Sequence, residues 1–314
     1  MAPPLVKARL SASTATVLGA ERKFVYSMTM LFNYHTHSEY CDAKVPASTL
    51  AEEAFRKGYR ILGFSSHAPL PLASGWLMSW EELQPYAQTV RALERTWADR
   101  GMKIFLGLEI DYIKNIVKPD DPVYQSIKPD FRLGSVHFLQ GLSEDEFTVD
   151  EPADLFERHM NQTVRGDASV IWKQYYENMM GLVEAGGFDI LCHFDLVKKN
   201  NRGGRWFDET SPAYLDAAFA VVDRAAELDI VAEINTGGLA RGSTDSPYPS
   251  LSILKRMREK GLRLTIGDDA HSPEHLGDFR KDAAEAARAA GYTSFWYLDE
   301  TLSWKDIGLD EAIK

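Results

Sequence analysis

The segment KIFLGLEIDY, residues 103–112, is a nearly continuous apolar run that carries two carboxylates near its end. Such a run is typical of a strand buried on both faces of a parallel sheet. Segments with apolar residues at helical spacing, such as STLAEEAFRKGY at 48–59, separate similar runs. This alternation predicts an α/β fold with a parallel sheet covered by helices, and seven or eight units suit a closed or nearly closed barrel. The other runs cover residues 31–37, 61–67, 131–138, 188–194, 230–238, 262–271 and 294–298.

The composition is that of an ordinary soluble enzyme, with 45% hydrophobic and 26% charged residues among 314. The formal net charge of -11 argues against a nucleic-acid partner, because proteins that bind nucleic acid carry a basic face. Two cysteines, Cys41 and Cys192, imply no disulfide framework and favour a cytoplasmic location. No apolar run approaches the ~20 residues that span a bilayer, so we expect no association with a membrane.

The first 29 residues differ in character from the rest of the chain. Residues 1–29 carry four basic side chains and only one acid, Glu21. They are consistent with a transit peptide or with a misplaced start, and we treat them as an N-terminal extension that is disordered or foreign to the native chain. No linker rich in Gly, Pro or Ser divides the remainder, which predicts a single domain over residues 30–314.

Most histidines gather at the ends of the predicted strands. HTH at 35–37 closes the run 31–37, and residues i and i+2 of a strand face the same side, so its two imidazoles should project together. Because active groups of α/β barrels lie at the carboxyl ends of strands, we expect the strand-end histidines to converge on one rim. His159 and His275 are interpreted as ordinary helix or surface residues. The six strand-end histidines are His35, His37, His67, His137, His193 and His271.

Three carboxylates join these histidines. Glu109 lies near the end of the run 103–112, and Asp42 follows the HTH motif. Asp269 precedes His271 by two residues in GDDAH, so both should face the site. Three protein ligands suffice for one catalytic zinc ion, so nine candidates indicate two or three divalent ions. Imidazole and carboxylate ligands without thiolate favour Zn, Fe or Mn, and Cys192 is expected to be a buried core thiol.

Seven motifs occur in an order that resembles the PHP (polymerase and histidinol phosphatase) family, most closely its bacterial histidinol-phosphatase branch. The resemblance covers roughly residues 31–290. It implies a distorted (β/α)7 barrel with a three-metal site at the C-terminal rim of the strands, and hydrolysis of L-histidinol phosphate in histidine biosynthesis. The motifs are HTH (35–37), SSHAPLP (65–71), GLEIDYI (107–113), LGSVHFL (133–139), LCHFDLVKK (191–199), EINTGG (233–238) and IGDDAHSP (266–273).

The resemblance also implies how the ligands are divided among the metals. The first ion would be held by His35, His37, Glu109 and Asp269. The second would share Glu109 and add His137 and His193. The third would take Asp42, His67 and His271. Asp268 stands where serine is common in the family, which leaves the ligand positions intact.

Hydrolysis of a phosphate ester needs an activated water and neutralisation of the phosphoryl charge, and adjacent divalent ions supply both. No side-chain nucleophile is then required. Asp269 or His271 is a candidate for transferring a proton to the leaving oxygen.

Basic residues on the loops after the strands should bind the phosphate of the substrate. We expect contacts from Lys199 and Arg241, with Lys198 and Arg202 behind them. Asn235, at the end of a predicted strand, should also face the site.

Other interpretations of the same pattern remain open. The same fold and metals suit another small phosphomonoester or a phosphotyrosine peptide, as the PHP resemblance implies. A non-catalytic metal-binding regulatory protein would be favoured if ligands were missing, and none of the nine is. The loop APLPLASGWLMS at 68–79 is either a lid or ordinary packing. Glu39 and Asp111 are candidates for binding the imidazole and ammonium of histidinol. The sequence leaves the oligomeric state open.

Overall fold

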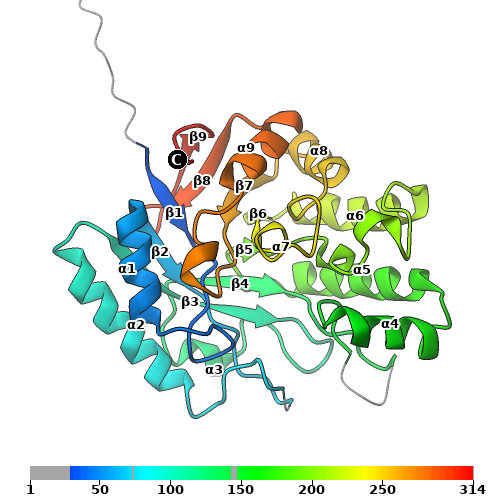
Figure 1. Ribbon diagram of the computed structural model, residues 1–314, viewed down its shortest axis with the longest axis horizontal. Coiled ribbons are helices and arrows are strands. Elements are labelled where there is room, and N and C mark those ends of the chain that lie inside the picture. Colours follow the sequence, from blue (N-terminus) through cyan, green and yellow to red (C-terminus); the bar gives the residue numbers. More distant parts are fainter. Residues whose placement is uncertain (1–28, 73, 143–146, 314) are drawn as a thin grey trace, which may run out of the picture.

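The computed structural model describes residues 29–72, 74–142 and 147–313, and the predicted extension at residues 1–29 lies almost wholly outside this part. Seven parallel strands pair with one another in chain order (Figure 1). This arrangement confirms the predicted distorted (β/α)7 barrel. The strands are β1 (Leu31–Asn33), β2 (Tyr59–Phe64), β3 (Lys103–Asp111), β4 (Phe131–Ser135), β5 (Ile190–Leu191), β6 (Val231–Asn235) and β7 (Arg263–Gly267).

Helices cover the outside of the sheet. Figure 1 shows α1 and α2 on one flank and α4, α5 and α6 on the opposite flank. The helix α1 ends at Gly58, whose φ of 93° is left-handed and whose N–H closes the last turn. Within the described residues, no helix combines the length and apolar character needed to cross a membrane. The helices are α1 (Ala47–Lys57), α2 (Leu83–Ala98), α3 (Pro122–Gln125), α4 (Ala153–Gln162), α5 (Ala168–Ala185), α6 (Pro212–Ala225), α7 (Gly237–Ala240), α8 (Leu251–Glu259) and α9 (Arg280–Ala289).

The strands are shorter than the apolar runs that predicted them. β1, β4, β5 and β7 each end two residues before a predicted metal ligand, so these ligands lie on the loops that follow the strands. Glu109 is an exception, because it lies inside β3. The rim of the barrel is therefore built largely from the first residues of the loops, as expected for an α/β barrel.

The run 294–298 does not join the barrel. It forms β8 (Ser294–Leu298), which pairs with β9 (Trp304–Gly308) in a separate antiparallel sheet. The hydroxyl of Tyr34 connects this hairpin to the barrel, because it donates to the carbonyl of Leu298 (3.0 Å) and accepts from the N–H of the same residue (2.8 Å). The barrel thus has seven strands, and a single domain over residues 30–314 stays a prediction.

The interior of the barrel is filled by Phe131, which is 1% exposed. A Cβ atom at Gly63 would lie 2.6 Å from the Phe131 ring, and Gly107 leaves even less room. The ring of Tyr34 packs edge-on at a centroid distance of 5.6 Å. Glycine is therefore needed at both positions for β2 and β3 to pass the ring, and the close packing holds these strands in place.

The barrel closes between β1 and β7 through groups just beyond the ends of the strands. The N–H of His37 donates to the carbonyl of Ala270 (3.0 Å), and the N–H of Ala270 donates to the carbonyl of His35 (3.2 Å). The side chain of Asn33 accepts a hydrogen bond from the N–H of Asp268 (2.9 Å). These bonds hold the HTH and GDDAH segments side by side.

Candidate metal centre

The carboxylate of Glu109 lies among five imidazoles and is 1% exposed. Although burial alone would raise the pKa of Glu109, His67 and His35 lower this pKa well below its usual range, so the carboxylate is ionised. Glu109 Oε1 lies 2.9 Å from His193 Nε2 and 3.7 Å from His137 Nε2. Glu109 Oε2 lies 3.1 Å from His67 Nδ1, 3.2 Å from His35 Nε2 and 3.6 Å from His37 Nε2.

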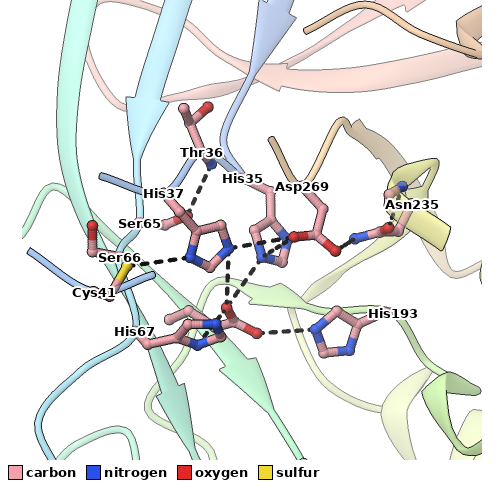
Figure 2. Close-up of polar contacts among 12 residues, drawn as sticks. His35, Thr36, His37, Cys41, Ser65, Ser66, His67, His193, Asn235 and Asp269 are labelled. Carbon is pink, nitrogen blue, oxygen red and sulfur yellow. Dashed lines mark hydrogen bonds and ion pairs between the residues drawn. The ribbon is translucent and has the colours of Figure 1, made fainter. Parts of the chain in front are cut away.

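Asp269, His271 and Asp42 extend this cluster. Asp269 Oδ1 lies 3.3 Å from His37 Nε2 and 3.5 Å from His271 Nδ1. Asp42 Oδ2 lies 3.1 Å from His271 Nε2. The ring of His271 stacks on that of His37 with centroids 3.8 Å apart. All nine residues predicted as ligands therefore converge. Figure 2 shows the imidazoles of His35, His37, His67 and His193 and the carboxylate of Asp269 gathered in one place.

The atoms of this cluster fit divalent cations. Four residues each offer a ligand atom within 4.8 Å of the others: His37, Asp42, His67 and His271. The last three of these are the residues predicted for the third ion. His37 Nε2, His67 Nδ1 and Asp42 Oδ1 are buried and lack a hydrogen-bond partner among the described residues. Unpaired polar atoms destabilise a protein interior, and bound cations would satisfy them.

Cys192 is a buried core thiol, as predicted, but it lies closer to the cluster than its position in a strand implies. Its Sγ is within 4.8 Å of ligand atoms of His35, Glu109 and His193. β5 ends at Leu191, so the alternation of side chains in a strand no longer applies. Burial raises the pKa of the thiol well above its ordinary value, and a protonated thiol is a poor metal ligand.

Two buried carboxylates orient the imidazoles. Glu233 accepts a hydrogen bond from His35 Nδ1 (2.9 Å), and Gly267 lacks a β-carbon where the Glu233 carboxylate needs the space. Asp111 accepts from both the backbone N–H (2.7 Å) and Nδ1 (2.9 Å) of His137. An imidazole that donates through Nδ1 leaves Nε2 free to bind a metal.

The sequence carries a signal for both carboxylates, but our predictions did not use it for Glu233 and considered Asp111 only for binding the substrate. Glu233 precedes Asn235 by two residues, and Asp111 follows Glu109 by two. The alternation of side chains places each of them on the same strand face as a residue already assigned to the site.

Both carboxylates considered for binding the imidazole and ammonium of histidinol have partners within the protein. Both oxygens of Asp111 contact His137 Nδ1. Glu39 accepts a hydrogen bond from the N–H of Ala47 (2.7 Å) at the start of α1. Neither residue is among the described residues that line the cavity over the cluster, so the structure favours neither assignment.

A cavity of about 680 Å³ opens over the cluster, and both Lys199 and Arg241 line it. Arg241 donates from Nη2 to Asp269 Oδ2 (2.8 Å) and from Nη1 to the carbonyl of Asp269 (2.9 Å). Lys199 Nζ donates to the carbonyl of Asp150 (2.5 Å) and lies 3.5 Å from its carboxylate. The geometry places both predicted phosphate residues beside the metal ligands.

Lys198 and Arg202 are not among the described residues that line the cavity. Lys198 is 3% exposed, and its ammonium donates to the carbonyl of Pro247 (2.9 Å) and pairs with Asp195 (3.2 Å). Arg202 is exposed and pairs with Asp245 (2.7 Å). The 3₁₀ turns after His193 direct both side chains elsewhere, so phosphate contacts from Lys198 and Arg202 stay predictions that these positions do not favour.

Asn235 is buried and its amide is engaged within the protein. It donates to Glu233 Oε2 (2.9 Å) and accepts from the N–H of Gly237 (2.8 Å). Its amide nitrogen also lies 3.4 Å from Asp269 Oδ2 (Figure 2). Asn235 faces the cluster as predicted, but it positions other side chains instead of contacting the cavity.

Trp76 makes the loop 68–79 part of the cavity wall. Its ring centroid lies 4.5 Å from that of His67, and it stacks on Phe138 at 5.4 Å. The two remaining histidines also belong to this region. His159 is buried with Nδ1 2.7 Å from Glu151 Oε1, and His275 lines the cavity. His159 is thus a helix residue of α4, as predicted, and His275 lies on the 3₁₀ turn at Pro273–His275, which borders the cavity.

A family model for the PHP domain matches residues 33–237, more than half of the chain. The chain belongs to the PHP domain family. A "Probable histidinol-phosphatase" from Deinococcus radiodurans is 29% identical to it over 269 residues, covering 84% of this chain and 95% of the relative. The histidinol-phosphatase of Bacillus subtilis is 24% identical over 263 residues, covering 77% and 94%.

A solved histidinol phosphate phosphatase has the same fold. The histidinol phosphate phosphatase from Lactococcus lactis, crystallised with zinc, L-histidinol and phosphate, superposes with a TM-score of 0.60 at 18% identity. The match covers 85% of this chain and 96% of that chain.

Asp268, next to the ligand Asp269, belongs to a buried network that faces away from the metal ligands. It accepts hydrogen bonds from Arg280 Nη1 (2.6 Å) and from the hydroxyl of Tyr59. Arg280 also donates to the carbonyl of Phe32 (2.9 Å). The network ties β7 to β1 and to the start of α9, just below Asp269, whose φ of 50° is left-handed.

Proposed function

We propose that this protein is a metal-dependent histidinol-phosphatase, which converts L-histidinol phosphate and water into L-histidinol and phosphate. One observation carries the proposal: nine imidazole and carboxylate ligands converge at a cavity that Lys44, Lys199 and Arg241 also line. Relatives that match over nearly their whole length bear the name of this activity. Two or three divalent ions, Zn, Fe or Mn, suit the ligand set.

The predicted division of the ligands remains our proposal. His35, His37, Glu109 and Asp269 would hold the first ion. Glu109, His137 and His193 would hold the second, and Asp42, His67 and His271 the third. When bound, such ions supply an activated water and neutralise the phosphoryl oxygens.

Arg241 positions the phosphate. Its guanidinium is anchored on Asp269 by two hydrogen bonds and reaches the cavity. Burial alone would lower the pKa of Arg241, but Asp269 raises this pKa above its ordinary value, so the side chain keeps its charge. A planar guanidinium presents several N–H donors to phosphoryl oxygens, and Lys199 adds a second positive charge at the cavity.

Of the two candidates for proton transfer, His271 is better placed than Asp269. Asp269 Oδ2 accepts from Arg241, and Oδ1 lies against His37. The His271 side chain is 19% exposed, against 6% for Asp269. We therefore propose His271 as the proton donor to the leaving oxygen, and in that role its imidazole would not at the same time bind the third ion.

The substrate is then a small phosphomonoester whose organic half carries a positive charge. The net charge of -11 gives no electrostatic basis for binding nucleic acid. Both cysteines are free, which suits the reducing cytoplasm that we propose as the compartment.

Phosphate release from L-histidinol phosphate, p-nitrophenyl phosphate and phosphotyrosine tests the proposal. We expect the highest kcat/KM for histidinol phosphate. If the protein hydrolyses the other two esters but not histidinol phosphate, it is a phosphatase, but the proposed substrate is wrong. The absence of hydrolysis of all three by metal-loaded protein would instead favour a regulatory role.

A further inference from the structure

Asp150 and Glu151 form an acidic wall of the cavity that has no role in the metal centre. The wall is held on two sides. The N–H of Val149 donates to the carbonyl of His137 (2.9 Å), which fixes the segment before the wall. Lys199 Nζ and Asn200 Nδ2 donate to the carbonyls of Asp150 and Glu151 (2.5 and 3.0 Å). The two carboxylates are thus built into the cavity.

The acidic wall carries negative charge close to the cluster. Burial alone would raise the pKa of Asp150, but Lys199 and His137 lower it to about 2, so this carboxylate is ionised. Glu151 is 7% exposed, and its carboxylate contacts His159 Nδ1 (2.7 Å). Burial raises the pKa of Glu151 to about 7, and a cation bound beside the carboxylate would offset this effect.

The rest of the cavity suits a small ligand with a short apolar middle. Leu155, Leu196 and Trp76 line the cavity together with the metal ligands. Ser272 also lines it, and its Oγ is buried without a hydrogen-bond partner among the described residues. A hydroxyl in this position is able to hydrogen-bond a polar ligand or water in the cavity.

We propose that Asp150 and Glu151 form a cation subsite, which binds the ammonium or imidazolium group of the substrate while its phosphate lies over the metal ligands. The inference rests on the proposed function, because it assigns the organic half of the same substrate. It also explains the position of Lys199, which balances part of the negative charge of the acidic wall. With a phosphomonoester whose organic half is neutral or anionic, Asp150 would keep only Lys199, and Glu151 only His159, as a side-chain partner among the described residues.

Two isosteric variants, Asp150→Asn and Glu151→Gln, test the subsite. In at least one of them we expect kcat/KM for L-histidinol phosphate to fall about 10-fold or more, mainly through KM, because a hydrogen bond to a charged group is lost. Hydrolysis of p-nitrophenyl phosphate, which has no cation, should change less than about 2-fold, and the metal content should match that of the wild type. Inhibition of that reaction by L-histidinol should weaken in the same variant.

Glu157→Gln is the matched control, because Glu157 lies on the exposed surface of α4 and pairs with Arg205. It should behave as the wild type with both substrates. An equal loss for both esters in Asp150→Asn and Glu151→Gln would overturn the subsite, and so would unchanged kinetics in both.

The two proposals fail in different ways. If the wild type hydrolyses p-nitrophenyl phosphate but not histidinol phosphate, the proposed function fails and the subsite is tested with 2-aminoethyl phosphate against glycerol phosphate. The subsite would be supported if the wild type prefers 2-aminoethyl phosphate and if Glu151→Gln or Asp150→Asn removes this preference. A wild type without that preference would overturn it.

Discussion

The carboxylate of Glu233 accepts a hydrogen bond from Nδ1 of His35 at 2.9 Å, which leaves Nε2 of His35 facing Glu109. Such partners fix the tautomer of a metal-binding imidazole, and their loss weakens metal affinity. We expect Glu233→Gln to lower metal affinity about 10-fold or more, measured by competition with a chromophoric chelator.

The control for this variant is Glu227→Gln, because Glu227 is exposed and pairs with Arg224 on the surface. It should bind metal as the wild type does. Equal affinities in Glu233→Gln and the wild type would show that Glu233 does not orient His35.

His137 tests the link between metal and turnover. Its Nε2 points toward Glu109 at 3.7 Å, while Asp111 holds its Nδ1. We expect His137→Ala to lose bound metal and to reduce kcat by more than about 100-fold, as for loss of a ligand and its orienting contact. Elemental analysis and phosphate release on one preparation measure both effects. Full activity in His137→Ala would show that His137 is not a ligand of the metal centre.

The pH dependence of stability tests the burial of Glu151. The pKa of Glu151 in the folded protein is about 7, which is above its ordinary value. At pH values between these two pKa values, Glu151 is protonated in the folded protein and ionised in the unfolded chain. This carboxylate therefore makes the free energy of unfolding fall as pH rises from about 5 to 7. In Glu151→Gln the fall should be smaller, as measured by urea unfolding at both pH values. Parallel curves for variant and wild type would contradict the account of this residue.

The buried pair of Arg280 and Asp268 tests the closure between β1 and β7. Their side chains are 3% and 0% exposed, and Arg280→Met would leave the Asp268 charge without its guanidinium partner. We expect a loss of about 3 kcal/mol or more in the free energy of unfolding.

Arg288→Met provides the comparison for the buried pair, since Arg288 and Asp310 form an exposed pair. It should change the free energy of unfolding by less than about 0.5 kcal/mol. Similar values for Arg280→Met and Arg288→Met would show that the buried pair does not stabilise the closure.

The convergence of the nine predicted ligands could be anticipated because eight of them follow a strand whose apolar run is visible in the sequence, and Glu109 lies near the end of β3. A parallel barrel brings such positions to one rim whatever the details of its loops. His35 and Asp269 illustrate this, since both meet the cluster although β1 is shorter than its run.

The loop residues were harder to place. Lys198 and Lys199 are adjacent in the sequence, yet a 3₁₀ turn buries one and leaves the other on the cavity. No periodicity predicts the direction of such side chains. Glu151 and His159 were missed for a related reason, because their contact depends on how the segment after β4 folds back along His137.

The most direct test of the metal centre measures metal content and hydrolysis of L-histidinol phosphate in one purified sample, before and after chelation. We predict two or three equivalents of Zn, Fe or Mn per chain, loss of activity on their removal, and recovery when a divalent ion is restored. A chelated sample that is free of these ions and still hydrolyses histidinol phosphate at the original rate would contradict the account.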